Sequence, residues 1–180
     1  MKTKSFFAAL MAVAVMVGFT SCGDPEGPEV WADEIEDFYR LEATSTCFAI
    51  VYMDVEGVHE FADKLDSLAQ DFSEKSKDRH APVYKLALEE MAKDYEAAED
   101  MLKVYNALPV EFGEWTKGEI NDDGDQVWTA IEKNSGNKMI FTNNYMNDWD
   151  ANIDEDSEEE NIDFYDPYIK MLLEDLEEED

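Results

Sequence analysis

Apolar side chains over residues 84–105 recur every three or four positions without a break, which is the spacing of one face of an α-helix. The same spacing runs over residues 58–72 and over residues 35–55. Such apolar faces must be buried against a neighbour, and the segments that link the three stretches are short. Residues 31–108 are therefore predicted to form three long helices packed as an antiparallel bundle.

Residues 44–52 allow a second interpretation, because their β-branched and aromatic side chains are also typical of a strand. The helical stripe continues through them, which favours a helix. Cys47 lies in this stretch, and only His59 and His80 could serve as its partner base in catalysis. We therefore interpret Cys47 as a small buried side chain.

The pattern changes over residues 112–145, where three short runs are rich in Trp, Thr, Val and Ile. An Asp-Gly pair at 123–124 separates the first two runs, and Asn-Ser-Gly-Asn at 134–137 separates the last two. Turn sequences of this kind between strand-like runs indicate consecutive β-hairpins. We predict a three-stranded β-meander that rests on the bundle, since so small a sheet is not stable alone.

The remaining chain is polar and acidic over residues 146–162, which we expect to form a loop. Residues 163–178 return to helical spacing and predict a C-terminal amphipathic helix. The predicted architecture is thus a single α+β domain over residues 31–180, with a helical bundle, a small meander and a last helix.

Charge limits the partners that this chain can have. It carries 45 acidic and 14 basic side chains, a formal net charge of −31. A nucleic-acid ligand needs a basic surface and is therefore excluded as a partner. Cations, basic proteins and neutral glycans stay possible, and solubility alone would also explain so acidic a composition.

The N-terminus has the pattern of an export signal. Lys2 and Lys4 precede an apolar run over residues 6–17, and small residues then lead to Cys22. The run is shorter than the ~20 apolar residues that a membrane-spanning helix needs. The segment resembles the lipobox signal of bacterial lipoproteins, with Phe19 as a departure from the usual box.

That resemblance implies that residues 1–21 are removed and that Cys22 becomes the acylated first residue of the mature protein. Two or three acyl chains would hold Cys22 in a lipid bilayer. Residues 22–30, rich in Gly, Pro and acids, are expected to form a tether. Acids close behind the cysteine, at Asp24 and Glu26, resemble cell-surface export signals. We therefore expect an outer-membrane lipoprotein of the cell envelope, with exposure at the cell surface as a further expectation. A soluble secreted product is the alternative.

One acidic segment has the ligand spacing of a calcium-binding loop. Calcium prefers six to eight oxygen ligands, which alternate carboxylates followed by a late Glu can supply. Ile153 stands where such a loop needs glycine, so chance similarity in an acidic segment is the competing explanation. Calcium is the only cofactor that the sequence suggests, with candidate ligands Asp148, Asp150, Asn152, Asp156 and Glu159.

Tryptophans in the β-region suggest a second candidate site. Trp115, Trp128 and Trp149 would form a surface for a glycan or a protein partner if they were exposed on the small sheet. The alternative is that they pack the sheet against the bundle.

Catalytic motifs are missing from the sequence: it has no Gly-x-Ser-x-Gly elbow, phosphate loop, dinucleotide glycine motif or zinc-type cysteine pair. The sequence therefore favours a non-catalytic binding or structural module. A calcium-dependent module and an envelope hydrolase are the alternatives.

Overall fold

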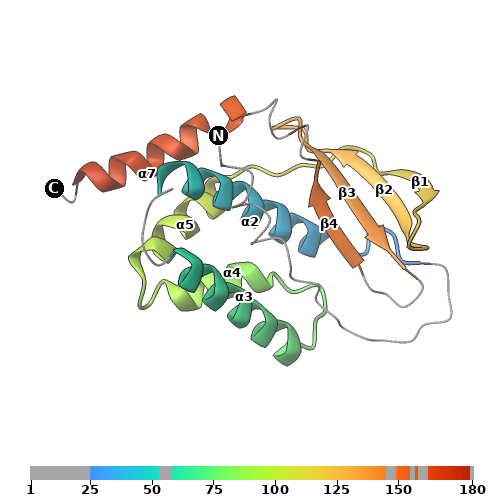
Figure 1. Cartoon of the computed structure of the whole chain (residues 1–180), viewed down its shortest axis with the longest axis horizontal. Coiled ribbons are helices and arrows are strands. Elements are labelled where there is room, and N and C mark those ends of the chain that lie inside the picture. The colour runs from blue at the N-terminus through green and yellow to red at the C-terminus, as the bar shows by residue number, and fades with distance from the viewer. Residues whose placement is uncertain (1–24, 53–57, 145–148, 155–156, 158–161, 179–180) are drawn as a thin grey trace.

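The computed structural model describes residues 25–52, 58–144, 149–154, 157 and 162–178. A layer of helices lies beside an antiparallel sheet, and the long helix α2 (Ala32–Val51) runs from the sheet into the helical layer (Figure 1). The remaining helices of that layer are α3 (Val58–Lys75), α4 (Val83–Met91) and α5 (Glu96–Ala107). The predicted α+β class is confirmed, and residues 44–51 are helical rather than extended.

The sheet is a simple meander in the order β1-β2-β3-β4, with every neighbouring pair antiparallel. Its strands are β1 (Thr116–Ile120), β2 (Gln126–Ile131), β3 (Lys138–Asn143) and β4 (Trp149–Ile153). The two predicted hairpin turns are present, and Gly124 and Gly136 adopt φ values of +92° and +79° in them. Glycine tolerates this left-handed conformation because it has no Cβ.

The fourth strand corrects the sequence prediction, which placed an acidic loop over residues 146–162 and counted three strands. Trp149, Ala151 and Ile153 alternate with the two polar residues between them, so β4 has the period-two pattern of a strand with one face in the core. Asp and Asn disfavour strands in isolation. Pairing with β3 and burial of the alternate apolar side chains override that preference here.

The third predicted helix is also corrected, because it is divided into α4 and α5 by a turn at residues 92–95. Tyr95 leaves the helical conformation, with φ −132° and ψ +113°, and precedes the first turn of α5. The turn at residues 92–95 allows α5 to pack against α4. No glycine or proline marks the break, so the heptad spacing alone could not reveal it.

The C-terminal segment is helical, as predicted. A short 3₁₀ helix, η2 (Ile162–Tyr165), leads into α7 (Asp166–Glu178), which packs against α2 and α5. The far end of α7 extends beyond the other helices in Figure 1.

Two apolar clusters meet at α2. Its residues Ile35, Tyr39, Ala43 and Cys47 belong to a cluster formed with the sheet and α7. Leu41 belongs to the second cluster, formed with α3, α4 and α5. Because α2 is buried on two sides, it packs both against the sheet and against the other helices. The fold also confirms Cys47 as a buried side chain, and burial raises its pKa to about 12.

Part of the expected tether over residues 22–30 lies against the domain instead of extending from it. The Glu26 carbonyl accepts a hydrogen bond from Nδ2 of Asn143 on β3, at 2.5 Å. The Glu26 carboxylate pairs with Arg79 in the α3–α4 connection. Trp31, which follows, is only 3% exposed. The chain is therefore held by the domain from Glu26 onward.

Candidate functional site

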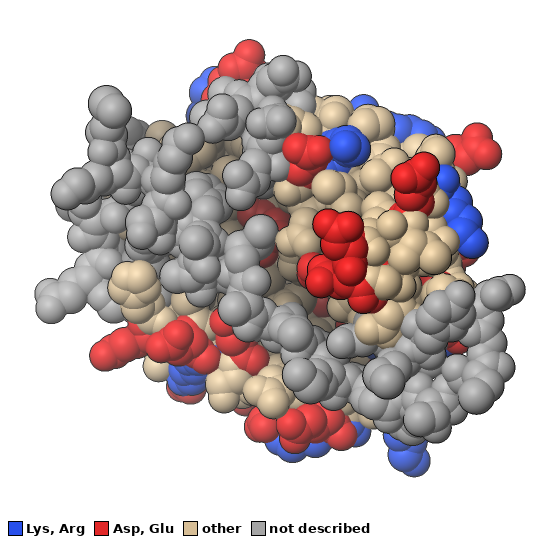
Figure 2. All heavy atoms as spheres, turned by 45° about the vertical axis from the view of Figure 1, so that its right-hand side comes forward, with Lys and Arg blue, Asp and Glu red and all other residues tan. Residues whose placement is uncertain are grey.

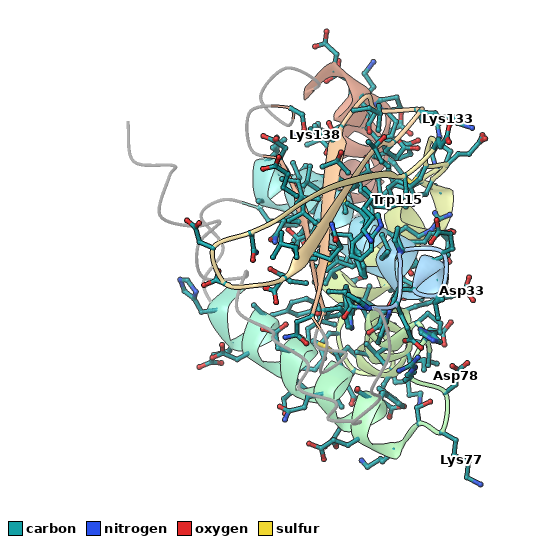
Figure 3. The ribbon with its side chains drawn as sticks, turned by 90° about the vertical axis from the view of Figure 1, so that its right-hand side faces the viewer. Asp33, Lys77, Asp78, Trp115, Lys133 and Lys138 are labelled. Atoms are coloured by element: carbon teal, nitrogen blue, oxygen red, sulfur yellow. The ribbon has the colours of Figure 1, made fainter. Side chains whose placement is uncertain are left out.

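The predicted tryptophan surface is not what the sheet presents to solvent. Trp128 is 7% exposed and lies in the core, while Trp115 and Trp149 are half-buried and pack against it. All three rings surround Phe141, with centroids 5.6 to 6.4 Å from it. Figure 3 shows Trp115 where the chain enters β1. The tryptophans therefore join the sheet to the helical layer, which was the alternative interpretation.

The predicted calcium ligands are only partly described. Asp150 and Asn152 lie on β4, where Nδ2 of Asn152 donates a 2.8 Å hydrogen bond to Oδ2 of Asp150. An extended strand does not wrap around a cation as a calcium loop does. Asp148, Asp156 and Glu159 lie outside the described residues, so the calcium site stays a prediction. The lipidation candidate Cys22 also lies outside them.

A polar groove where α2, α4 and α5 meet is the candidate site that the structure itself provides. It encloses about 320 Å³. Both signs of charge line it together with one aromatic ring and one amide, contributed by Asp33, Glu36, Asp37, Arg40, Pro82, Lys85, Tyr105 and Asn106. Because α2 residues three and four positions apart share one helix face, its four contributions project toward the same side.

Asp37 forms the buried wall of this groove and is 1% exposed. Its carboxylate accepts hydrogen bonds from the backbone N–H groups of Tyr84 at 3.0 Å and Lys85 at 3.2 Å. These groups belong to the first turn of α4, whose N-cap Pro82 provides no side-chain cap. Tyr105 on α5 also donates to Asp37, at 2.5 Å. One carboxylate from α2 thus caps α4 and binds α5.

Burial raises the pKa of Asp37 to about 6, although the hydrogen bonds from Tyr105 and from the backbone of Tyr84 and Lys85 favour the ionised form and limit the increase. A negative charge at the start of α4 also complements the positive end of the helix dipole. These interactions occupy both carboxylate oxygens. The main role of Asp37 is therefore structural, because it holds α4 and α5 against α2.

Arg40, one turn further along α2, binds the C-terminal end of α5. Its Nη1 donates to the carbonyl oxygens of Tyr105, at 3.2 Å, and Leu108, which belong to the C-terminal turn of α5. Its Nε and Nη2 donate to Oε1 of Glu36. A cation thus stabilises the negative end of the α5 dipole. Two residues one turn apart on α2 therefore bind opposite helix ends. Asp37 binds the N-terminus of α4, and Arg40 binds the C-terminus of α5.

Three polar groups on the groove keep their hydrogen-bonding capacity. Within the described part of the chain, no hydrogen bond or ion pair engages the side chains of Asp33, Lys85 and Asn106. Asp33 extends outward at the start of α2 in Figure 3. Lys85 is half-buried, and its charge acts on Asp37 by lowering the pKa of that carboxyl. The groove therefore has Asp37 as a buried wall, and its rim carries three polar side chains that no other described residue engages in a hydrogen bond or ion pair.

A second cluster of buried polar groups lies beside Asp37, around Glu34. Oε2 of Glu34 is 4.0 Å from Nδ1 of His80, and the His80 ring meets the Trp31 ring edge-on at 4.6 Å. In the described structure, neither of these two atoms nor Nε1 of Trp31 has a hydrogen-bond partner. Burial, with the neighbouring Asp37, raises the pKa of Glu34 to about 8. Glu34 is thus largely protonated at neutral pH.

The chain has 45 acidic and 14 basic side chains, and side chains of both kinds are visible on the surface (Figure 2). On the face shown in Figure 2, acidic side chains gather near the middle of the view and basic ones lie mostly toward its edge. The described residues contain no group of three or more His, Cys, Asp or Glu side chains arranged to hold a metal ion. Nor do they include a helix long and apolar enough to cross a membrane.

Comparisons with known proteins provide no family for this chain. No protein-family model matches it, and neither characterised proteins nor solved structures gave a significant match. The site must therefore be interpreted from its own residues.

Sequence reasoning missed the groove because its residues interrupt no motif and share no spacing beyond that of an ordinary helix. One signal could have been used. Pro82 begins a helix without a capping side chain of its own, so the first N–H groups of that helix need an acceptor from solvent or from elsewhere in the chain. The sequence does not reveal which of its 45 acids fills that role.

Proposed function

We propose that this chain is a lipid-anchored protein of the bacterial cell envelope, with acyl chains on Cys22 and a non-catalytic binding domain behind it. The observation that carries the proposal is the export-type segment that ends at Cys22. The contacts of Glu26 with Asn143 and Arg79 support it from the structural side, because the domain begins within a few residues of the proposed anchor.

The short distance between Cys22 and Glu26 would restrict how the domain is oriented at the membrane. A chain spans at most ~3.6 Å per residue, so the residues between Cys22 and Glu26 reach roughly 14 Å. An acylated Cys22 would therefore keep the face that carries Glu26, Arg79 and the end of β3 close to the lipid headgroups. The acyl chains would supply all of the membrane affinity, and the acidic domain would need no lipid-binding surface.

Binding is favoured over catalysis by the state of the reactive groups in the described residues. Asp37, in the groove, is occupied by three hydrogen bonds. Cys47 is buried, with a pKa raised to about 12. A nucleophile or base must reach its substrate in the correct protonation state, and neither group meets that requirement. The polar side chains on the rim of the groove could contact a polar ligand.

Metabolic labelling tests the anchor. Cells producing the chain are grown with a radiolabelled or clickable fatty acid, and the protein is followed by gel and by membrane fractionation. We expect label on the wild-type chain and on Cys47→Ala, but not on Cys22→Ala, which should leave the membrane fraction. Cys47 is the matched control, since it is the only other cysteine. Label on Cys22→Ala, or an unlabelled wild-type chain in the soluble fraction, would contradict the proposal.

A further inference from the structure

Residues 26–31, which we call the N-terminal strap, are held against the domain at both of their ends. At the first end, the Glu26 carboxylate pairs with Arg79, and the Glu26 carbonyl accepts a hydrogen bond from Asn143 on β3. At the second end, the Trp31 side chain is 3% exposed and belongs to the apolar cluster of the sheet. The strap is therefore part of the folded domain, although it precedes the first helix.

The α3–α4 connection binds the strap through two consecutive residues. The Arg79 guanidinium lies over the Trp31 ring, 4.9 Å from its centre, and the His80 ring meets the same ring edge-on at 4.6 Å. A cation over an aromatic face is attracted by the negative potential of the ring. Because Arg79 binds Glu26 as well as Trp31, any change that withdraws Arg79 loosens both ends of the strap.

Glu34 places a buried carboxyl group one helical turn after Trp31. It is only 5% exposed, and its Oε2 is 4.0 Å from Nδ1 of His80, which is too long for a hydrogen bond. Among the described residues, neither of these two atoms has a hydrogen-bond partner. An ionised carboxylate in this position would be a buried charge with an unpaired oxygen, which is costly. Glu34 is therefore neutral while the strap is closed on the domain.

The groups around Glu34 determine what happens when it loses its proton. Asp37 and Asp78 oppose ionisation by repulsion, whereas the positive charge of Arg79 favours it. An ionised Glu34 must therefore attract Arg79, which already binds Glu26, or reach water. Either response weakens the contacts of the strap. The titratable groups that act on Glu34 are Asp37 on α2, Tyr84 on α4, and Asp78, Arg79 and His80 in the α3–α4 connection.

We propose that the N-terminal strap is a pH-sensitive latch: the proton held at Glu34, beside His80, keeps residues 26–31 closed on the domain, and its loss opens them. The open form releases a proton that the closed form retains, so its population increases with pH. Burial raises the pKa of Glu34 from 4.5 to about 8. The closed form is thus most favoured below about pH 4.5, and this advantage is lost as the pH rises through about 8. The latch lies in the domain itself and does not depend on acylation of Cys22.

Hydrogen exchange followed by mass spectrometry measures opening of the strap in the full chain. The N–H groups of Val30 and Trp31 donate to the carbonyls of Gly27 and Pro28, at 3.1 and 3.2 Å, so their protection reports the closed form. After correction for the intrinsic pH dependence of exchange, we expect this protection to fall at least about tenfold between pH 5 and pH 8. At both pH values it should be lower than the protection of β3, because the strap opens without global unfolding.

Strap protection that does not change with pH, or that equals the protection of β3, would overturn the proposal. Glu34→Gln should keep the strap closed at pH 8, because the amide is neutral like the protonated acid and cannot ionise. Glu29→Gln, at an exposed acid within the strap, is the matched control and should keep the wild-type pH dependence. Protection of β3 shows that each variant is folded. A Glu34→Gln chain that keeps the wild-type fall in strap protection would contradict the latch.

A second variant tests the contacts that hold the strap. Arg79→Met should lower strap protection at pH 5 as well as at pH 8, because it removes the ion pair with Glu26 and the cation over the Trp31 ring. Lys77→Met, at an exposed lysine of the same connection, is the control and should leave strap protection unchanged. Wild-type strap protection in Arg79→Met would show that Arg79 does not hold the strap, against the proposal.

Discussion

The Tyr105 hydroxyl on α5 donates a 2.5 Å hydrogen bond to Oδ1 of Asp37 on α2. The same carboxylate accepts the N–H groups that begin α4, so one side chain connects three helices. Asp37 is buried on α2, the helix that contributes residues to both apolar clusters. The position of α4 and α5 relative to α2 depends on this acid as well as on apolar packing.

Asp37→Ala should lower the free energy of unfolding by about 2–4 kcal/mol, because it removes a helix cap and leaves buried donors without an acceptor. Tyr105→Phe should cost about 1 kcal/mol, because it removes one hydrogen bond and leaves the cap in place. Urea unfolding at neutral pH measures both. Asp71→Ala, at an exposed carboxylate on α3, is the control. Equal stability of Asp37→Ala and the control would show that the cap contributes nothing.

Glu34 should make stability fall as the pH rises. Burial and the neighbouring Asp37 raise its pKa from 4.5 to about 8 in the folded chain. The folded state therefore binds a proton that the unfolded state releases above about pH 4.5. Its contribution to stability is complete below that pH and is lost as the pH rises through about 8.

Glu34→Gln should flatten the stability profile between about pH 4.5 and 8, since the amide cannot ionise. Glu89→Gln, an exposed acid on α4, serves as the control. Melting temperatures at several pH values in that range provide the test. A Glu34→Gln profile that keeps the wild-type slope would contradict the assigned protonation state.

Glu132, just after β2, should have the opposite pH dependence. Burial alone would raise its pKa, but hydrogen bonds outweigh it and lower the pKa below 4.5. The donors are the N–H groups of Glu111, Asn134 and Ser135 and the side chains of the latter two. Its contribution is present above the unfolded pKa of about 4.5 and is lost as the pH falls through the lower folded value.

Glu132→Ala should therefore destabilise the chain by about 3 kcal/mol at neutral pH and by less in acid, because several buried donors lose their acceptor. Urea unfolding at pH 7 and pH 4 measures the difference. Glu111→Ala, which removes an exposed carboxylate paired with Lys133, should have little effect at either pH. An equal cost of Glu132→Ala at both pH values would argue against an ionised Glu132.

The two described candidate ligands, Asp150 and Asn152, predict by themselves that millimolar calcium changes the melting temperature of the chain by less than about 1 °C. Asp150 and Asn152 lie on an extended strand and bond to one another, which does not match the curved path of a calcium loop. Differential scanning fluorimetry provides the measurement. A rise of several degrees with calcium, reversed by EDTA, would instead establish a site that includes residues 148–159, because a ligand specific for the folded state stabilises it.

Several elements could be predicted because local pattern and tertiary environment agree. The glycines at 124 and 136 and the alternation in β2 and β3 identify both hairpins. The heptad spacing of α3 reflects burial on one side, with Leu65 and Ala69 in the core. In these segments the secondary structure that the local sequence favours is also the one that the tertiary contacts favour.

The parts that could not be predicted depend on contacts distant in sequence. β4 is a strand because β3 pairs with it and the core accepts Trp149, Ala151 and Ile153. The break at Tyr95 accompanies the packing of α5 against α4, and the turn contains no glycine or proline. Asp37 is one carboxylate among many in the sequence, and its role as a cap 47 residues away from Tyr84 exists only in the folded chain.

Mass spectrometry of the N-terminal peptide of the mature protein, isolated from membranes, tests the central claim most directly. The account predicts a peptide that begins at Cys22 and carries the mass of a diacylglyceryl group, with or without a further acyl chain. A mature protein that begins elsewhere, or that retains an unmodified Cys22, would contradict the lipid anchor.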